Sequence, residues 1–139
     1  MRREDLLEEI AGLIRDLIQV SRESFRGCAD ELQLGPGEAQ ALWLLGITEA
    51  TSTGDLARRL RVDPANASTL LTKLEKRRLV TREPAKHDRR KRRILLTPAG
   101  RKARQELVSC MANDPPSFAE LSTTELRSLR DLLRRVDRT

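Results

Sequence analysis

The sequence predicts a mainly α-helical protein with one small β-hairpin, an α+β fold. Three observations predict it. Most apolar residues recur at helical spacing in segments that Gly and Pro separate. Two of these segments are short and nearly contiguous, and the pattern after them changes to two strands around a basic loop. Because the 139 residues contain only three aromatic side chains, the core is expected to be aliphatic. The three are Phe25, Trp43 and Phe118.

The N-terminal segment predicts a long amphipathic helix over about residues 3–32. Acidic and basic residues lie between its apolar positions, and Gly35, Pro36 and Gly37 end it. A second helix is expected over about residues 36–45, because proline suits the first helical position. The apolar stripe of the first helix consists of Leu6, Leu7, Ile10, Leu13, Ile14, Leu17 and Ile18.

The two short helices follow in quick succession. Thr53 is expected to cap a helix that runs to about Leu60, and Asp63 to cap another that starts at Pro64 and ends near Arg77. Only two residues separate the two helical segments. This spacing is typical of a helix-turn-helix.

The strands that come next complete the pattern. Residues 79–81 predict one strand, residues 86–90 a polar loop and residues 93–97 the returning strand. Two strands around a basic loop after a helix-turn-helix indicate a winged helix-turn-helix. A further helix is expected over about residues 98–111 with Thr97 as its cap, and a last one is capped by Ser122 with Glu125 in a capping box.

Charge is distributed unevenly along the chain. Residues 58–104 hold 17 Lys and Arg against 4 Asp and Glu, whereas the rest of the chain is acidic on balance. A basic middle between acidic ends is expected when one segment contacts phosphate and the flanks do something else. The same segment has no aromatic residue, although single-stranded and RNA-binding surfaces usually stack bases on aromatic rings. Specific binding to duplex DNA explains this composition better.

Composition also argues against other classes of protein. There is no apolar stretch of membrane-spanning length and no signal-peptide pattern, so we expect a cytoplasmic protein. The two cysteines, Cys28 and Cys110, are expected to be free thiols. No enzyme, metal site or cofactor is expected, because the sole histidine, His87, lies in the basic loop and no glycine-rich phosphate cradle is present.

Over about residues 5–136 the chain resembles the MarR family of bacterial regulators. The resemblance rests on the segment Asp55–Leu60, on Leu74 to Arg77, on Leu79 to Arg82 and, above all, on residues 87–100. That last segment has an Asp-Arg-Arg loop, a basic strand and then Leu-Thr-Pro-Ala-Gly. The resemblance implies a homodimeric transcription regulator, most simply a repressor, that binds pseudo-palindromic promoter DNA.

The second short helix is expected to be the recognition helix. Its outward residues are small and polar, which suits close approach to base edges in the major groove. Asn66 is expected to read adenine and Lys73 to contact phosphate. In the wing the resemblance implies that Asp88 pairs with Arg90 and orients it toward the minor groove. The predicted DNA-binding residues are Thr53, Ala65, Asn66, Ser68, Thr69, Lys73, Arg89, Arg90 and Lys91.

Two positions depart from the family pattern. Relatives usually have glycine where Arg61 and Arg78 stand, in the turn between the two helices and directly after the recognition helix. Glycine adopts positive φ at little cost, so each arginine must either accept that conformation or change the turn. Each arginine also adds positive charge near the expected path of the phosphates.

The ends of the chain are expected to associate two copies. We predict a helical dimerisation lobe from residues 1–34 and 113–139, and a DNA-binding lobe from residues 35–112. The first and last helices each carry an apolar stripe, and pairing of two chains would bury both. A dimer of this kind places two recognition helices about one DNA turn apart, roughly 34 Å.

The resemblance also implies a small-molecule effector, often phenolic, between the two lobes. Phe25, Cys28 and Trp43 are the predicted pocket residues. Two alternatives remain open: an oxidant-sensing repressor that uses the Cys28 thiol, and a non-specific basic nucleic-acid-binding protein.

Overall fold

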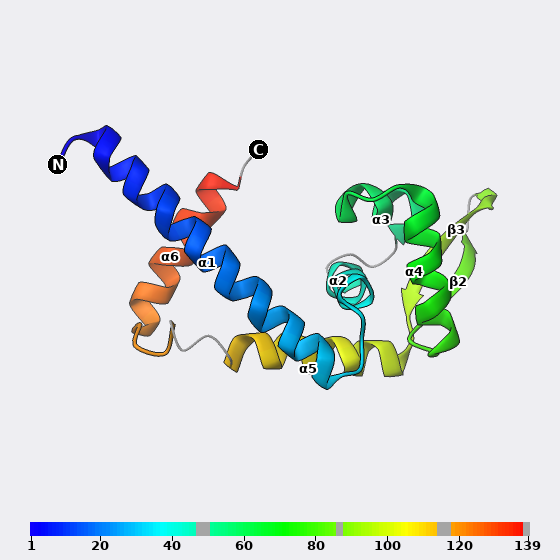
Figure 1. Cartoon of the computed structure of the whole chain (residues 1–139). Helices are drawn as coiled ribbons and strands as arrows, with labels where there is room; N and C mark the ends of the chain where they lie inside the picture. The colour runs from blue at the N-terminus through cyan, green and yellow to red at the C-terminus, as the bar shows by residue number, and fades with distance from the viewer. Residues whose placement is uncertain (47–50, 86–87, 114–117, 138–139) are drawn as a thin grey trace.

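The computed structural model describes residues 1–46, 51–85, 88–113 and 118–137. For residues 51, 85 and 88–91 it describes the backbone only. Within these residues the chain is mainly helical, with one small antiparallel sheet (Figure 1). The fold class predicted from the sequence is therefore confirmed. The elements are α1 (Arg3–Glu31), α2 (Pro36–Leu45), β1 (Thr51–Ser52), α3 (Thr53–Leu60), α4 (Pro64–Lys76), β2 (Val80–Ala85), β3 (Asp88–Leu96), α5 (Pro98–Asn113) and α6 (Thr123–Val136).

The sheet has the strand order β1-β3-β2, and both pairings are antiparallel. Val80 lies opposite Leu96, and the register shifts between Pro84 and Ala85 near the end of the hairpin. Both hairpin strands are longer than the sequence predicted: β2 runs on to Ala85, and β3 already begins at Asp88, within the expected loop. The strand β1, which pairs Thr51 with Ile94, was not predicted, since two residues carry no recognisable strand pattern.

Hydrogen bonds at the helix ends confirm most of the predicted caps. The Asp63 carboxylate accepts from a backbone N–H of α4, and the Thr97 hydroxyl accepts from the Gly100 N–H at the start of α5. Ser122 and Glu125 form the predicted capping box, which holds the pKa of Glu125 below its usual value. The prediction that Thr53 caps α3 was wrong, because Ser52 is the cap and Thr53 is the first helical residue.

The core lies where the end of α1 meets α2, α3, α4, α5 and the sheet (Figure 1). It is aliphatic, as the composition predicted, and α4 supplies a complete buried face to it. Burial of such side chains stabilises the fold by about 1.5–3 kcal/mol each. The largest fully buried side chains are Leu42, Leu56, Leu71, Leu74, Ile94, Leu107 and Cys28.

Three helices end with a non-glycine residue in the left-handed region. Arg61 has a φ of 56° and Arg78 a φ of 59°, so both arginines accept the conformation that glycine would favour. Gln33, after α1, also has a φ of 56°. After each of them the next N–H bonds back to a carbonyl of the preceding helix, for example Leu79 to Leu74 at 3.0 Å. The turns thus keep the Schellman geometry without glycine.

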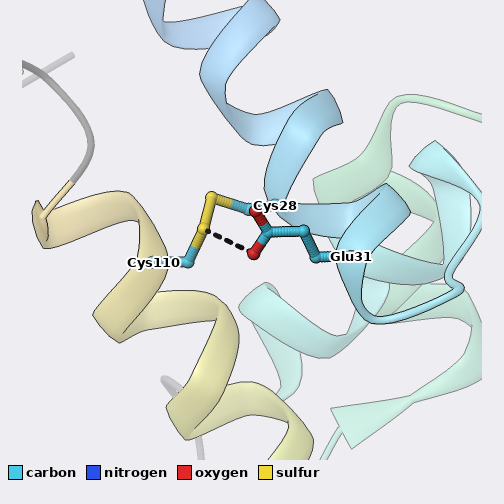
Figure 2. Close-up of a disulfide and its surroundings, with 3 residues drawn as sticks. All are labelled: Cys28, Glu31 and Cys110. Atoms are coloured by element: carbon cyan, nitrogen blue, oxygen red, sulfur yellow. Dashed lines mark hydrogen bonds between the residues drawn. A yellow bond between two sulfur atoms is a disulfide. The ribbon is translucent and has the colours of Figure 1, made fainter.

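A disulfide joins Cys28 on α1 to Cys110 on α5 (Figure 2). Their Cα atoms are 5.9 Å apart, and 82 positions separate the two residues in the sequence. The expectation of two free thiols was wrong. Sequence spacing carried no sign of the pair, because the contact arises only when the end of α1 packs against the last turns of α5.

The first part of α1 and the whole of α6 lie away from the winged helix (Figure 1). Their apolar side chains are unusually exposed: Leu13 is 61% exposed and Leu132 56%. No residue of α6 is buried. Among the described residues there is no helix with the length and apolarity to cross a membrane.

Replacing Gly100 by alanine tests the packing of α5 against the turn after α4. The new Cβ would lie 1.9 Å from the Leu79 carbonyl oxygen, so backbone has to move. We expect G100A to lower the free energy of unfolding by about 1–3 kcal/mol. Gly27→Ala is the matched control: nothing lies within 4 Å of its added Cβ, so it should stabilise the chain by about 0.5–1 kcal/mol. Equal unfolding midpoints of the two variants in urea would contradict the packing described.

Candidate nucleic-acid interface

The helix α4, which the sequence predicts to be the recognition helix, buries one face and exposes the other. Ala67, Leu71 and Leu74 are fully buried, which fixes how the helix is rotated about its own axis. The opposite face is made of small or polar residues, and such a face admits the close approach that reading base edges requires. Its exposed members are Ala65, Asn66, Thr69, Thr72 and Lys73, and Ser68 is half-buried among them.

Local hydrogen bonds order this face. The Thr69 hydroxyl donates to the Ala65 carbonyl and the Thr72 hydroxyl to the Ser68 carbonyl, both at 3.0 Å. Each hydroxyl oxygen keeps lone pairs that can accept a hydrogen bond from outside. The Asn66 side-chain amide lies 3.5 Å from an oxygen of Asp63, the cap of the helix. Asn66 thus stays at the exposed N-terminal end of α4, where a helix presents its side chains to a groove.

The wing consists of β2 and β3 and extends beyond α4 (Figure 1). Arg93 on β3 lies 3.4 Å from the Glu83 carboxylate on β2, across the hairpin, and Arg92 is exposed. The side chains of Asp88, Arg89, Arg90 and Lys91 lie outside the described part of the structure. Their DNA contacts and the pairing of Asp88 with Arg90 therefore stay predictions.

Arg82 ties the wing to the recognition helix. Its side chain is 17% exposed and reaches from β2 to three groups of α4. The Nε atom lies 2.7 Å from the Glu75 carboxylate, and Nη2 donates to the Ser68 carbonyl at 3.1 Å and to the Thr72 hydroxyl at 3.3 Å. One guanidinium thus fixes the position of the wing relative to the helix face described above.

Arg77 ties the other end of α4 to the junction between α1 and α2. Its guanidinium donates to the Gln33 carbonyl at 2.6 Å and to the Leu32 carbonyl at 3.2 Å. The carboxylate of Glu38, on α2, lies 3.6 Å from the same guanidinium. The recognition helix is therefore attached at its C-terminal end to the long N-terminal helix.

Several basic residues of the middle segment thus have partners inside the protein. Besides Arg77 and Arg82, Arg101 donates to the Leu96 carbonyl and Arg104 to the Trp43 carbonyl, at 3.2 and 3.1 Å. A count of charges in the sequence could not separate the arginines that bond to other parts of the protein from those available to bind phosphate. The hydrogen bonds of Arg77 and Arg82 to other elements were not predicted for that reason.

The profile of the MarR family matches residues 32–91, which contain α2, the helix-turn-helix and the start of the wing. This part of the chain is therefore similar in sequence to the MarR family. No curated protein matches the chain in sequence.

Solved structures of MarR-family proteins share the fold over most of the chain. A MarR family protein from Bacillus stearothermophilus has a TM-score of 0.84 at 20% identity, covering 98% of this chain and 96% of its own. A MarR-family transcriptional regulator from Silicibacter pomeroyi has a TM-score of 0.72 at 25% identity, with 89% and 84% covered. A mutant of MepR from S. aureus, bound to an oligodeoxyribonucleotide, has a TM-score of 0.67 at 21% identity, with 91% and 94% covered.

The pocket residues predicted from the MarR resemblance lie in two different settings. The rings of Phe25 and Trp43 meet edge to face, with centroids 6.1 Å apart, and Arg104 stands 5.9 Å from the Trp43 centroid. Cys28 is fully buried and bonded to Cys110. Trp43 also borders a cavity of about 410 Å³ between α1, α2 and α5, with Leu17, Val20, Ser21, Ser24, Val108, Met111, Ala112 and Phe118.

Replacing Arg82 tests the tie between wing and recognition helix. We expect Arg82→Ala to lower the free energy of unfolding by about 1–3 kcal/mol, because a partly buried carbonyl and carboxylate lose their charged partner. Arg82→Lys should recover only part of the loss, since an ammonium cannot match the planar fork. Arg92→Ala, at an exposed position of β3, is the control and should leave the urea midpoint within experimental error. A midpoint for Arg82→Ala equal to that of the control would contradict the tie.

Proposed function

We propose that the chain is a sequence-specific double-stranded DNA-binding transcriptional regulator, a dimeric repressor of the MarR type that a small-molecule ligand releases from DNA. The observation that carries the proposal is the exposed, small and polar face of α4, held beside a basic hairpin by Arg82. The match of residues 32–91 to the MarR family supports it, as does the similar fold of a MepR mutant bound to an oligodeoxyribonucleotide.

In this mechanism α4 enters the major groove. Asn66 reads adenine through its amide, while Ala65, Ser68 and Thr69 allow close contact and Lys73 meets the backbone phosphates. The wing follows the DNA to the neighbouring minor groove, where Arg89 and Arg90 insert. A chain bound across a promoter in this way blocks polymerase, so its direct effect is repression. The proposed site of action is the cytoplasm, and the mechanism has no catalytic step.

The dimer is proposed from the uncovered apolar faces of α1 and α6. A folded chain seldom leaves so continuous a row of large apolar side chains in water, and burial between two copies removes it. The occupant we propose is a second copy of this chain, because pairing through both ends also sets two α4 helices on one face of DNA. The exposed apolar residues are Leu6, Leu7, Ile10, Leu13, Ile14, Leu17, Ile18 and Val20 of α1, and Leu126, Leu132, Leu133 and Val136 of α6.

The effector is proposed to occupy the cavity beside Trp43. Its volume, about 410 Å³, lies in the range of small-molecule sites, and its lining is almost wholly apolar apart from two serines. This suits a small aromatic or phenolic compound whose hydroxyl could bond to Ser21 or Ser24. Since the cavity lies between α1 and α5, an occupant there would press on the helices that join the two proposed lobes.

The decisive experiment is selection of duplexes from a random DNA pool by the purified protein, together with its mass in solution. The proposal expects an enriched palindrome whose half-sites are about one turn apart, bound by a dimer. If no sequence is enriched and unrelated DNA competes equally, the chain is instead a non-specific nucleic-acid-binding protein.

Two substitutions on α4 separate base reading from phosphate contact. Asn66→Ala should weaken binding to the selected duplex by about 1–3 kcal/mol and relax preference at one base pair. Lys73→Ala should weaken binding to all duplexes alike and reduce the salt dependence by about one phosphate contact. Affinities measured by titration over a series of salt concentrations, on selected and scrambled duplexes, distinguish the two. Identical behaviour of both variants on both duplexes would remove the proposed role of Asn66.

The dimer is tested by placing a charge on its proposed surface. Because Ile14 and Leu133 are 43% and 51% exposed in a single chain, the double variant Ile14→Glu/Leu133→Glu should still fold. We expect it to be monomeric in sedimentation and to lose most of its affinity for the palindrome. Arg15→Ala, at the neighbouring exposed position, is the control that should remain dimeric. A dimeric double variant would show that another surface joins the copies.

A further inference from the structure

A separate cavity lies where the end of α2, the end of β3 and the start of α5 meet, at the base of the wing (Figure 1). Its volume is about 330 Å³, and it shares no lining residue with the cavity beside Trp43. Apolar side chains and two cations meet in this lining, a combination typical of small-molecule sites. The residues that carry this chemistry are Leu45, Gly46, Leu95, Leu96, Arg101 and Arg104.

Both arginines of the cavity are held in place by the backbone. Arg101 donates from Nη1 to the Leu96 carbonyl at 3.2 Å, and Arg104 donates from Nε to the Trp43 carbonyl at 3.1 Å. A guanidinium has five N–H donors, so most donors of each group remain for another acceptor. Because residues three apart in a helix lie on the same face, the two groups can converge on one ligand.

Neither of these two cations pairs with a carboxylate among the described residues. By contrast, Arg77, Arg82 and Arg93 each pair with a glutamate. The first turn of α5 contains no acidic residue that could compensate the two charges. Arg104 is half-buried and stands 5.9 Å from the centroid of the Trp43 ring, so only dipoles and the ring face its charge. An anion between the two guanidinium groups would remove their mutual repulsion.

Gly46 leaves the space through which Arg104 reaches the cavity. A Cβ at this position would overlap the Nε, Cδ and Cζ atoms of Arg104. The φ of Gly46 is −79°, an ordinary helical value, so the backbone itself does not require glycine. The lack of a side chain is therefore explained by the place of the guanidinium across the end of α2.

We propose that this cavity binds a small carboxylate with an apolar body. The planar fork of a guanidinium matches the two oxygens of a carboxylate, and the apolar body would lie against Leu45 and Leu96. The occupant would join the end of α2 to the start of α5. This inference goes beyond the proposed function, since the site is separate from α4 and from the cavity beside Trp43, and needs neither DNA nor a second copy.

The test is an NMR titration of the full chain, without DNA, with hexanoate as the probe. Neutral hexanamide is the matched control for charge, and inorganic phosphate is the control for a bare anion. We expect saturable shifts of the Leu45, Gly46 and Leu96 amides. Hexanoate should bind about tenfold more tightly than either control, because only hexanoate uses both the guanidinium groups and the leucines.

Three results of the titration would overturn the proposal. Equal affinity for hexanamide would remove the recognition of charge, and equal affinity for phosphate would remove the carboxylate as the ligand class. Shifts confined to Leu17 and Val108 would place the probe in the cavity beside Trp43 instead. The proposed function would stand in each case, because selection of DNA duplexes tests it independently.

Two variants test the named groups. Gly46→Ala displaces the Arg104 guanidinium without changing the net charge, and Arg101→Gln removes the other cation. Each should weaken hexanoate binding about tenfold. Since Arg101 is exposed, its replacement keeps the test valid even if Gly46→Ala fails to fold.

Lys102→Gln is the matched control for the loss of a charge. Lys102 is exposed on α5 and lies outside the lining of the cavity, so its variant should bind hexanoate within about twofold of wild type. Wild-type affinity of Arg101→Gln, or an equal loss in Arg101→Gln and Lys102→Gln, would overturn the site.

Discussion

The arrangement of the winged helix depends on the burial of one face of α4. Ala67, Leu71 and Leu74 enter an aliphatic core that also holds Leu42 of α2, Leu56 of α3 and Ile94 of β3. Because close-packed side chains allow little rotation of the helix, its small polar face is directed outward. The packing of the core thus determines which residues of α4 are exposed to a ligand. Residues far from the exposed face of α4 determine how rigidly the helix is held.

The arginines of the basic segment, residues 58–104, fall into two groups. Arg77, Arg82 and Arg104 bond to backbone carbonyls of other elements, and their charge is partly satisfied inside the protein. Others, such as Arg61, Arg78 and Arg92, are exposed at the surface, where the proposed function assigns them to phosphate. A count of positive charges in the sequence does not distinguish these two roles. The arginines that bond to backbone carbonyls join neighbouring elements, in a chain that has only three aromatic side chains to do so.

Local signals allowed most elements to be predicted from the sequence. Asp63 with Pro64, and Ser122 with Glu125, mark helix starts because their chemistry acts over three or four residues. The resemblance of residues 87–100 to a known wing added the overall arrangement. Four features escaped prediction: the strand at Thr51, the bond between Cys28 and Cys110, and the contacts that Arg77 and Arg82 make with other elements. Each joins two different elements, and periodicity within one segment holds no information about such contacts.

The left-handed arginines have a consequence for how this protein can change. A non-glycine residue at a φ near 60° costs the folded state about 1–3 kcal/mol, yet Arg61 and Arg78 both occupy such positions and both are exposed. Glycine at either position would relieve that cost and remove a cation beside the proposed DNA path. At these two turns a glycine would favour the stability of the fold, whereas an arginine would favour electrostatic attraction to DNA. A lineage selected for heat tolerance is expected to lose positive charge there, and one selected for tight DNA binding to keep it.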